Sequence, residues 1–340
     1  MKLIETRKAV GHVLCHDLTR IVKDEFKGAQ FTKGHVVTEE DIPMLLSMGK
    51  EHLYVWEMEE DMLHENEAAK RLYDICANDN IRPSQTIKEG KIEAFAESDG
   101  YFEVDADRLD EINSIDEIMI ATRHGSTAVK AGDKLAGMRV IPLVVKDDKL
   151  KEAERIYAGQ PILKLTPYKL KNAAVITTGS EVYKGIIKDT FTPVIIEKLK
   201  AYGIETKWHK IVDDGTENIK KAIDEVRAEK PDLILCTGGM SVDPDDNTPG
   251  AIKAAGAGII TYGAPVLPGA MFLLGYFDDG TPVMGLPGCV MYAKATVFDI
   301  VLPKVAAGIR VSKRDIVKMG NGGLCLGCEE CRYPVCPFGK

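Results

Sequence analysis

Short apolar runs alternate with amphipathic stretches in the C-terminal half of this sequence. Residues 173–176, 204–212 and 232–236 have the length and apolar content of strands. The stretches between them place apolar residues at helical spacing and end at Gly203 and Pro231, which stop helices. Asp214, with Glu217 three residues later, predicts a capping box for the second helix. We therefore expect a mainly parallel sheet covered by helices on both faces.

The same alternation continues downstream, and a different pattern precedes it. Residues 281–289 resemble another strand and 290–302 a helix, whereas 38–49 predicts a helix with a capping Thr38, and 52–56 a strand. Residues 57–80 favour a helix, 85–145 consist of short alternating runs typical of strands, and 147–154 favour a helix. We expect four parts: a small α+β domain with a helical connector (1–80), a β-rich domain (81–160), an α/β domain (170–310) and a cysteine-rich tail (311–340).

Composition excludes several classes of protein. Lysine and arginine number 44 against 52 aspartates and glutamates, a net charge of −8, which argues against a nucleic-acid-binding protein. The most apolar stretch, 264–277, is interrupted by prolines and glycines and is too short to span a bilayer. The first residues lack an apolar core of signal-peptide length. We expect a cytoplasmic protein whose eight cysteines are thiols or metal ligands rather than disulfides.

The loop from Thr237 to Ser241, Thr-Gly-Gly-Met-Ser, follows the third predicted strand directly. Adjacent glycines let backbone N–H groups approach an anion closely, and the flanking hydroxyls add donors, so the loop is suited to phosphate. An ordinary strand-to-helix turn has the same composition. The nearby carboxylates of Asp243, Asp245 and Asp246 could hold Mg²⁺ or orient water, or they could form a solvated loop with a helix cap.

Five motifs then recur in a family-specific order. They are Thr178-Gly-Ser-Glu181, Val212-Asp-Asp214, Thr237-Gly-Gly-Met-Ser-Val242 with Asp246, Leu267-Pro-Gly269 and Gly285-Leu-Pro-Gly288. Over residues 172–308 they resemble the molybdopterin-binding domain of the molybdopterin molybdotransferase and gephyrin family, in which the motifs are TGDE, VxDD, SGGVSVGxxD, KPGKP and GLPGNP. The resemblance implies a molybdopterin-binding fold, a homo-oligomer, and a role in molybdenum cofactor biosynthesis that serves a molybdoenzyme client.

The resemblance also implies site residues. Gly238, Gly239 and Ser241 would hold the terminal phosphate, and Glu181 and Asp246 would bind Mg²⁺ or position the hydrolytic water. The pocket would be completed by Thr178, Gly179, Asp214, Thr237, Pro268, Gly269, Pro287 and Gly288. The reaction would be Mg²⁺-dependent hydrolysis of adenylylated molybdopterin with insertion of molybdate.

Departures from the family pattern leave an alternative open. Leu267 and Ala270 replace the two lysines of KPGKP, Cys289 replaces the asparagine of GLPGNP, and Asp243 replaces a glycine. The loss of two cations where an oxyanion should bind weakens the case for molybdate insertion, but it leaves pterin binding intact. The alternative is a non-catalytic molybdopterin-binding carrier, sensor or maturation factor. Cys289 could touch the dithiolene or could be an ordinary buried thiol.

The tail contains Cys325, Cys328, Cys331 and Cys336, followed by Pro337. This spacing resembles the ferredoxin-type C-x2-C-x2-C-x3-C-P motif with one extra residue before the last cysteine. Four thiolates without histidine suit Zn²⁺ or an iron–sulfur cluster. A reduced, disordered tail is the alternative.

Overall fold

The structure is a computed structural model that describes residues 2–22, 26–55, 61–241, 243 and 246–340. The chain divides into two compact units. The first contains residues 1–97, 104–123 and 131–164, and the second contains 98–103, 124–130 and 165–340. Among the described residues, no helix is both long and apolar enough to cross a membrane.

The N-terminal part of the first unit has a small core of its own. It contains β1 (Lys2–Glu5), η1 (Thr6–Lys8), β2 (Leu18–Val22), β3 (Phe26–Phe31), α1 (Asp41–Ser47) and β4 (His52–Val55). β1 pairs antiparallel with β4, and β2 with β3, around buried apolar residues such as Leu14 and Leu45. The predicted strand is confirmed over 52–55, while Trp56 lies outside the described residues. The predicted helix forms, but Thr38 donates hydrogen bonds to Asp41 and does not cap it.

The rest of the first unit is a four-stranded antiparallel sheet with three helices. The sheet order is β6 (Ile81–Pro83), β7 (Ile92–Ala96), β11 (Lys134–Val140) and β9 (Ile118–Thr122), and β5 (Met62–His64) pairs with β12 (Val144–Lys146). The helices are α2 (Glu65–Cys76), α3 (Ala106–Asn113) and α4 (Asp147–Tyr157). The strand-rich prediction for 85–145 missed α3. Its capping residue is Asp105, but only Ile112 of the helix is buried, so the apolar period is weak.

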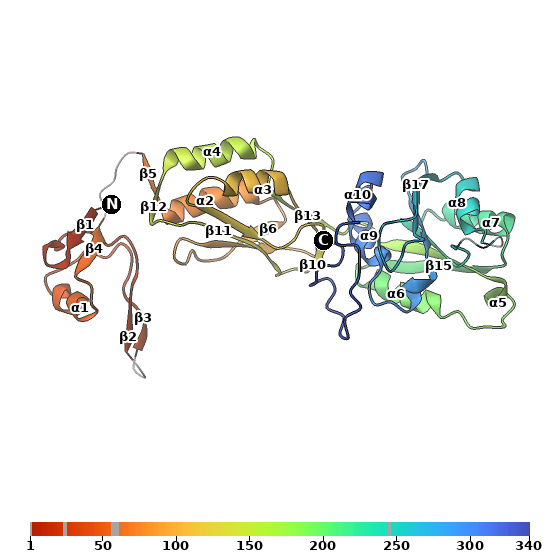
Figure 1. Cartoon of the computed structure of the whole chain (residues 1–340), viewed down its shortest axis with the longest axis horizontal. Helices are drawn as coiled ribbons and strands as arrows, with labels where there is room; N and C mark the ends of the chain where they lie inside the picture. Colours follow the sequence, from red (N-terminus) through yellow and green to blue (C-terminus); the bar gives the residue numbers. More distant parts are fainter. Residues whose placement is uncertain (1, 23–25, 56–60, 242, 244–245) are drawn as a thin grey trace. The chain divides into compact units, whose positions relative to one another are not determined.

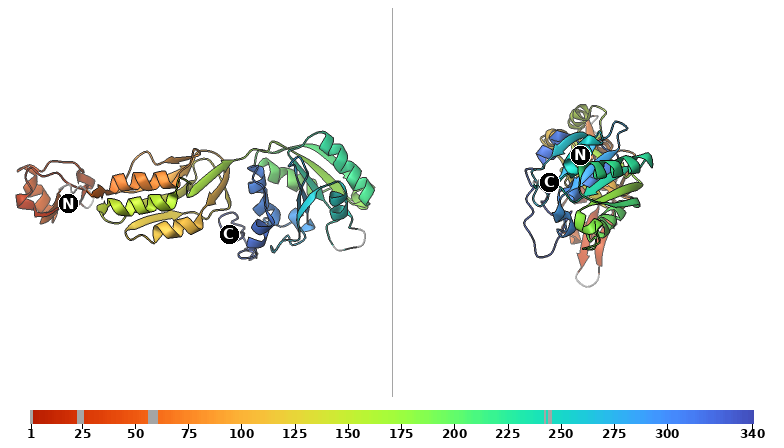
Figure 2. Two further views of the ribbon diagram at one scale, coloured as in Figure 1. Left: turned by 90° about the horizontal axis from the view of Figure 1, so that it is seen from above. Right: turned by 90° about the vertical axis from the view of Figure 1, so that its right-hand side faces the viewer.

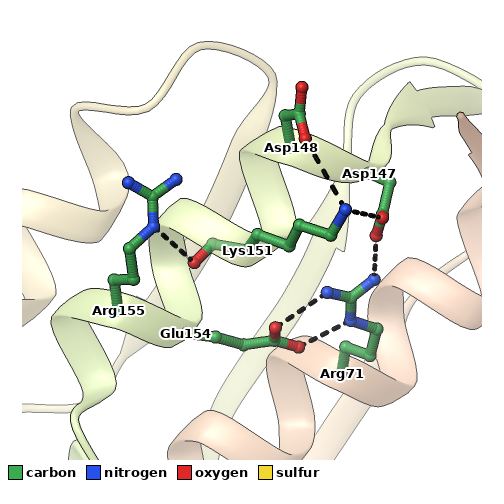
Figure 3. A network of polar contacts seen from close by, with 6 residues as sticks. All are labelled: Arg71, Asp147, Asp148, Lys151, Glu154 and Arg155. Atoms are coloured by element: carbon green, nitrogen blue, oxygen red, sulfur yellow. Dashed lines mark hydrogen bonds and ion pairs between the residues drawn. The ribbon is translucent and has the colours of Figure 1, made fainter.

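Helices α2 and α4 are joined by a cluster of charged side chains (Figure 3). Arg71 of α2 donates to both carboxylate oxygens of Glu154, at 2.6 and 2.8 Å, and to Asp147. Lys151 lies 2.7 Å from Asp147, and the hydrogen bonds from Lys151 and Arg71 hold the pKa of the Asp147 carboxyl below its usual range. Bidentate arginine–carboxylate geometry fixes two helices against each other more specifically than a lysine could.

The second unit is built on one six-stranded sheet. Its order is β15 (Glu205–Val212), β14 (Asn172–Thr178), β16 (Leu233–Thr237), β19 (Pro282–Leu286), β18 (Leu273–Tyr276) and β17 (Gly258–Tyr262). The first four strands are parallel, and β18 is antiparallel to both of its neighbours. The mainly parallel sheet expected from the sequence is therefore present. A separate three-stranded sheet has the order β10 (Thr127–Val129), β8 (Gly100–Val104) and β13 (Leu163–Pro167).

Helices cover both faces of the six-stranded sheet. On one face, α7 (Thr216–Ala228) and α8 (Thr248–Ala254) pack on Ile176 and Ile234. On the other, α6 (Phe191–Lys200), α9 (Val297–Ala306) and α10 (Lys313–Lys318) pack on Val175 and Leu235. Successive strand residues point to opposite faces of the sheet. Because helices cover both faces, consecutive residues of these strands are apolar. The left view of Figure 2 shows the teal helices on one side of the sheet and the blue helices on the other.

Two helix starts differ from the sequence prediction. α7 has Gly215 at its N-cap, with φ of 121°, and no side-chain cap, because Asp214 instead accepts a hydrogen bond from Ser180. α9 begins at Val297 rather than at 290, because Thr296 and Asp299 form the capping box there. A single 3-10 turn, η2 (Gly288–Met291), and an irregular segment occupy the intervening residues.

The tail after α10 is held to the second unit near both of its ends. Leu324 forms a parallel bridge with Leu267, and the N–H of Cys325 donates to the Leu267 carbonyl at 2.8 Å. Near the C-terminus, the Tyr333 hydroxyl donates to the Asp299 carbonyl, and Phe338 is buried in the same core as α9. The tail is drawn in dark blue in Figure 1.

Candidate functional site

The sheet topology gathers all five family-like motifs at one edge. β14, β15, β16 and β19 are parallel, so the loops that follow them lie at their common carboxyl end. β18 runs the opposite way, so the connection that leads into it from β17, residues 263–272, reaches the same edge. From β14 the chain continues to β15 on one side of the sheet, and from β16 it continues to β17 on the other side. The topological switch point therefore lies between β14 and β16, and α/β sheets bind ligands at such points.

The glycine loop, residues 237–241, is packed tightly against its neighbours. Gly238 and Gly239 have φ of 85° and 54°, which side chains rarely adopt. A Cβ on Gly238 would overlap the Thr178 carbonyl, and one on Gly239 would lie 2.9 Å from the Thr248 hydroxyl oxygen. Thr248 in turn donates to the Gly238 carbonyl at 2.9 Å. The loop conformation therefore requires both glycines.

Among the described residues, the backbone N–H groups of Gly238, Gly239 and Met240 in this loop have no hydrogen-bond acceptor. The carbonyls of Met240 and Ser241, by contrast, accept from the Tyr262 hydroxyl at 3.1 and 3.2 Å. Successive free N–H groups at a strand end form an anion-binding concavity.

The loop after β14 is organised by the two aspartates that follow β15. Asp214 accepts from the backbone N–H of Ser180 at 2.8 Å, and Asp213 accepts from the Ser180 hydroxyl at 2.6 Å. The Ser180 hydrogen bond holds the pKa of the Asp213 carboxyl below its ordinary value. Gly179 precedes α5 (Ser180–Tyr183), a single turn that leaves the Glu181 side chain exposed. Asp214 therefore positions this loop.

A polar cluster beneath the edge, in which Thr177 and Thr192 are buried, was missed from the sequence. The Thr177 hydroxyl lies within hydrogen-bond distance of the Asp189, Thr192 and His209 side chains. Asp189 also accepts from the N–H groups of residues 191 and 192, at 2.9 and 3.0 Å. Burial alone would raise the pKa of Asp189, but the hydrogen bonds it accepts outweigh burial and lower it. Only the Asp-x2-Thr spacing was visible in the sequence, because the other partners come from different strands.

The two predicted catalytic carboxylates lie on different loops of this edge. Glu181 is on α5, and Asp246 follows the glycine loop, where its N–H donates to the Asp243 carbonyl at 3.0 Å. Burial, with a smaller contribution from the Asp246 carboxylate, raises the pKa of Tyr262. Val242 and Asp245 lie outside the described residues.

The remaining predicted residues follow β19 or precede β18. Pro287 is buried and is the N-cap residue of η2, and the following Gly288 is exposed. Gly269 is buried with φ of 123°, and a Cβ there would lie 2.6 Å from Val297. Thr237 is fully buried, and its hydroxyl has no hydrogen-bond partner among the described residues. Burial raises the pKa of the Cys289 thiol, which favours an inert thiol over a reactive thiolate.

The metal site expected in the tail is not assembled. The described residues include no group of three or more histidine, cysteine, aspartate or glutamate side chains arranged to hold a metal ion. Cys328 and Cys331 are exposed, while Cys325 and Cys336 are partly buried. All four nevertheless line one cavity of about 300 Å³, together with Pro268.

Residues 174–307 match the family model described as a probable molybdopterin binding domain. This supports the domain that the sequence motifs indicated, but it does not single out the molybdotransferase and gephyrin family. Residues 3–57 match a domain of unknown function (DUF8806). Between them, the two matches leave the tail unassigned.

Curated relatives match a limited part of the chain. A competence-damage inducible protein of Bacillus cereus strain AH187 is 34% identical over 91 residues, which is 27% of this chain and 22% of that protein. The corresponding protein of Bacillus cereus strain G9842 is 36% identical over 84 residues, 25% of this chain and 20% of that one. The chain thus spans about a fifth of the length of these relatives.

Solved structures to which part of this chain is similar include molybdopterin biosynthesis proteins. MoaB from Thermus thermophilus is 24% identical, with a TM-score of 0.36, covering 41% of this chain and 98% of that one. A tungsten cofactor synthesizing MoaB from Pyrococcus furiosus is 24% identical, with a TM-score of 0.34, covering 40% and 92%. CinA from Thermoplasma acidophilum, described as of unknown function, is 23% identical, with a TM-score of 0.31, covering 35% and 89%.

Proposed function

We propose that the molybdopterin-binding domain holds molybdopterin at the carboxyl edge of its sheet, with the terminal phosphate on the glycine loop. The observation that supports this is the set of free N–H groups at Gly238, Gly239 and Met240, among the described residues, in a loop that Thr178, Thr248 and Tyr262 hold in place. Amides fixed in this way bind phosphate without a lysine. The Ser241 hydroxyl adds a donor.

The rest of the edge would contact the pterin. Thr178 ends β14 and Gly179 follows it, and Asp214 orders the loop there. Thr237 brings a buried hydroxyl, unpaired among the described residues, to the end of β16. Pro268, Gly269, Pro287 and Gly288 border the opposite part of the edge. An apolar wall with a few placed polar groups is typical of a cofactor pocket.

Our proposed reaction is hydrolysis of adenylylated molybdopterin, followed by insertion of molybdate for a molybdoenzyme client. Water attacks phosphorus in the anhydride, AMP leaves, and molybdopterin phosphate remains on the glycine loop. Asp246 would orient the water, and Glu181, on the turn that follows β14, would supply a second carboxylate to a Mg²⁺ ion. Mg²⁺ would neutralise the charge that develops on the anhydride.

One observation favours a non-catalytic carrier as the second candidate. Leu267 stands where the related family has a lysine, and its backbone is bridged to the tail rather than left open at the edge. A protein that had lost the oxyanion cations would still bind the pterin. Such a protein would deliver molybdopterin to a partner without cleaving its adenylylate.

AMP release separates these two candidates. The purified full chain is incubated with adenylylated molybdopterin, Mg²⁺ and molybdate, and Asp246→Ala is compared with Asp243→Ala, a change to an exposed carboxylate of the same loop. We expect Asp246→Ala to lower AMP release about 100-fold with pterin affinity nearly unchanged, because orienting the water matters only in the transition state. Asp243→Ala should retain activity.

Two results would contradict the proposal in different ways. If Asp246→Ala weakened pterin binding but left hydrolysis normal, the role of Asp246 would be wrong. If the unaltered chain bound molybdopterin but released no AMP, the carrier would replace the enzyme.

A further inference from the structure

The tail forms a cavity whose wall is rich in thiols. Its lining brings together Cys325, Cys328, Cys331 and Cys336, and it continues over Pro268 and the segment 293–295. The volume is about 300 Å³. Neither family match covers the tail, and the function proposed for the glycine loop does not use it.

Both ends of the thiol-bearing segment are fixed to the domain. At its start, the N–H of Leu267 donates to the Gly323 carbonyl, and the N–H of Cys325 donates to the Leu267 carbonyl, each at 2.8 Å. After it, Tyr333 bonds to the backbone of α9 and Phe338 is buried. Closing a loop costs entropy, and these anchors have already restricted the segment between them. Between these anchors, the segment that carries Cys328 and Cys331 is less well packed, and its Leu326 side chain is 73% exposed.

Charge at the cavity suits thiolates. Lys294 and Arg332 line the same cavity. Four thiolates around Zn²⁺, or around a [4Fe–4S]²⁺ core, leave a net charge of about −2 by the ligand count of such centres. The two cations would compensate this charge and favour the deprotonated sulfurs that a metal needs.

We propose that Cys325, Cys328, Cys331 and Cys336 bind one thiophilic metal centre in this cavity. Cys325 and Cys336 are partly buried at the anchored ends, and Cys328 and Cys331 lie on the exposed segment between them. Binding requires Cys328 and Cys331 to turn inward, because no three such side chains of the described residues stand at metal-binding distance. Zinc and iron–sulfur centres share this tetrathiolate chemistry.

Metal analysis of the full-length chain, purified without oxygen, tests the site. We compare it with Cys328→Ser/Cys331→Ser and with two controls. Cys289→Ser removes a thiol outside the cavity lining, and Leu326→Ser changes an exposed residue of the same segment. We expect each chain to hold either about one zinc ion or about four iron ions. In the second case the protein should also show broad visible absorbance. The double variant should lose at least about 90% of this metal, because two of four ligands are gone.

Trypsin gives a second readout that uses the unaltered chain. Cleavage after Arg332 should slow about tenfold when metal is bound, because metal binding opposes local opening of the segment. A chelator should restore the faster rate.

Two outcomes overturn the proposal. One is a chain that holds no metal after incubation with Zn²⁺, or with sulfide and equal amounts of ferrous and ferric iron, which supply the oxidation state of a [4Fe–4S]²⁺ core. The other is a double variant that retains the metal content of the unaltered chain. Neither readout involves molybdopterin, so failure of pterin binding at the glycine loop would leave this test unaffected.

Discussion

The glycine loop and the tail meet the same edge of the sheet, but they are held in different ways. The loop packs closely against Thr178, and its carbonyls accept hydrogen bonds from Thr248 and Tyr262. The tail is fixed near Leu324 and Phe338, and the thiols of Cys328 and Cys331 between these anchors are exposed. The fold therefore pre-organises the loop, whereas the metal that we propose would close the tail segment.

This difference has a consequence for energetics. Substitutions in the loop should cost folding stability even without ligand, because the native packing is already complete. Substitutions of the tail thiols should cost little without metal and much more with it, because metal binds only the folded arrangement. Four measurements test this difference, in decreasing order of the expected change.

The largest effect is expected from Gly238→Ala. The new Cβ would overlap the Thr178 carbonyl at a φ of 85°, so we expect a loss of about 4 kcal/mol in the free energy of unfolding by combining backbone strain and overpacking. Urea unfolding of the second unit measures it. Gly250→Ala, in α8 with nothing within 4 Å of the new Cβ, is the matched control and should be neutral or stabilising. Equal effects of the two changes would show that the loop is not tightly packed.

Metal loading should have the next largest effect. With free metal at about 100 times its dissociation constant, the free energy of unfolding should rise by about 2.7 kcal/mol, and a chelator should reverse the rise. Thermal unfolding with and without Zn²⁺ measures the change. Cys328→Ser/Cys331→Ser should unfold like the metal-free chain under both conditions. A rise of the same size in that variant would place the metal elsewhere.

Asp189→Asn should destabilise by about 1–2 kcal/mol near neutral pH, because it removes an acceptor from Thr177 and Thr192. The pKa of Asp189 is lowered in the fold, so its contribution is present above the unfolded pKa and is lost as pH falls through the folded value. The variant should therefore lose less stability than the unaltered chain between about pH 5 and 2. Urea titrations across that range measure it, with Asp224→Asn on α7 as control.

Glu181→Gln should have the smallest effect on folding. Its side chain is exposed, so the free energy of unfolding should change by less than about 0.5 kcal/mol. AMP release should nevertheless fall, because the variant lacks the negatively charged carboxylate that we propose binds Mg²⁺. Parallel unfolding and AMP assays check this pair of expectations. Normal hydrolysis by Glu181→Gln would remove Glu181 from the proposed machinery.

Much of the second unit could be predicted because its signals are local. Apolar strands such as β14 and helical spacing such as Ile219 and Ile223 on α7 depend on neighbouring residues alone, and both are confirmed. Helix starts were less predictable. Asp214 lies in a capping-box sequence, yet its carboxylate accepts a hydrogen bond from the backbone N–H of Ser180, in the loop after another strand. α9 starts where Thr296 and Asp299 are reciprocally bonded, well after the predicted start at residue 290.

Local sequence was enough to predict the alternation of strands and helices over residues 173–236, the two adjacent glycines and the cysteine spacing, because each depends on residues close together in the chain. The contacts between distant residues came from the tertiary structure alone: Thr177 meets His209 of a neighbouring strand, and Leu267 meets Leu324 of the tail. The tertiary structure also decided that the thiols line one cavity beside Pro268 without forming a closed metal site among the described residues. Such pairings depend on strand order and register, which local periodicity does not encode.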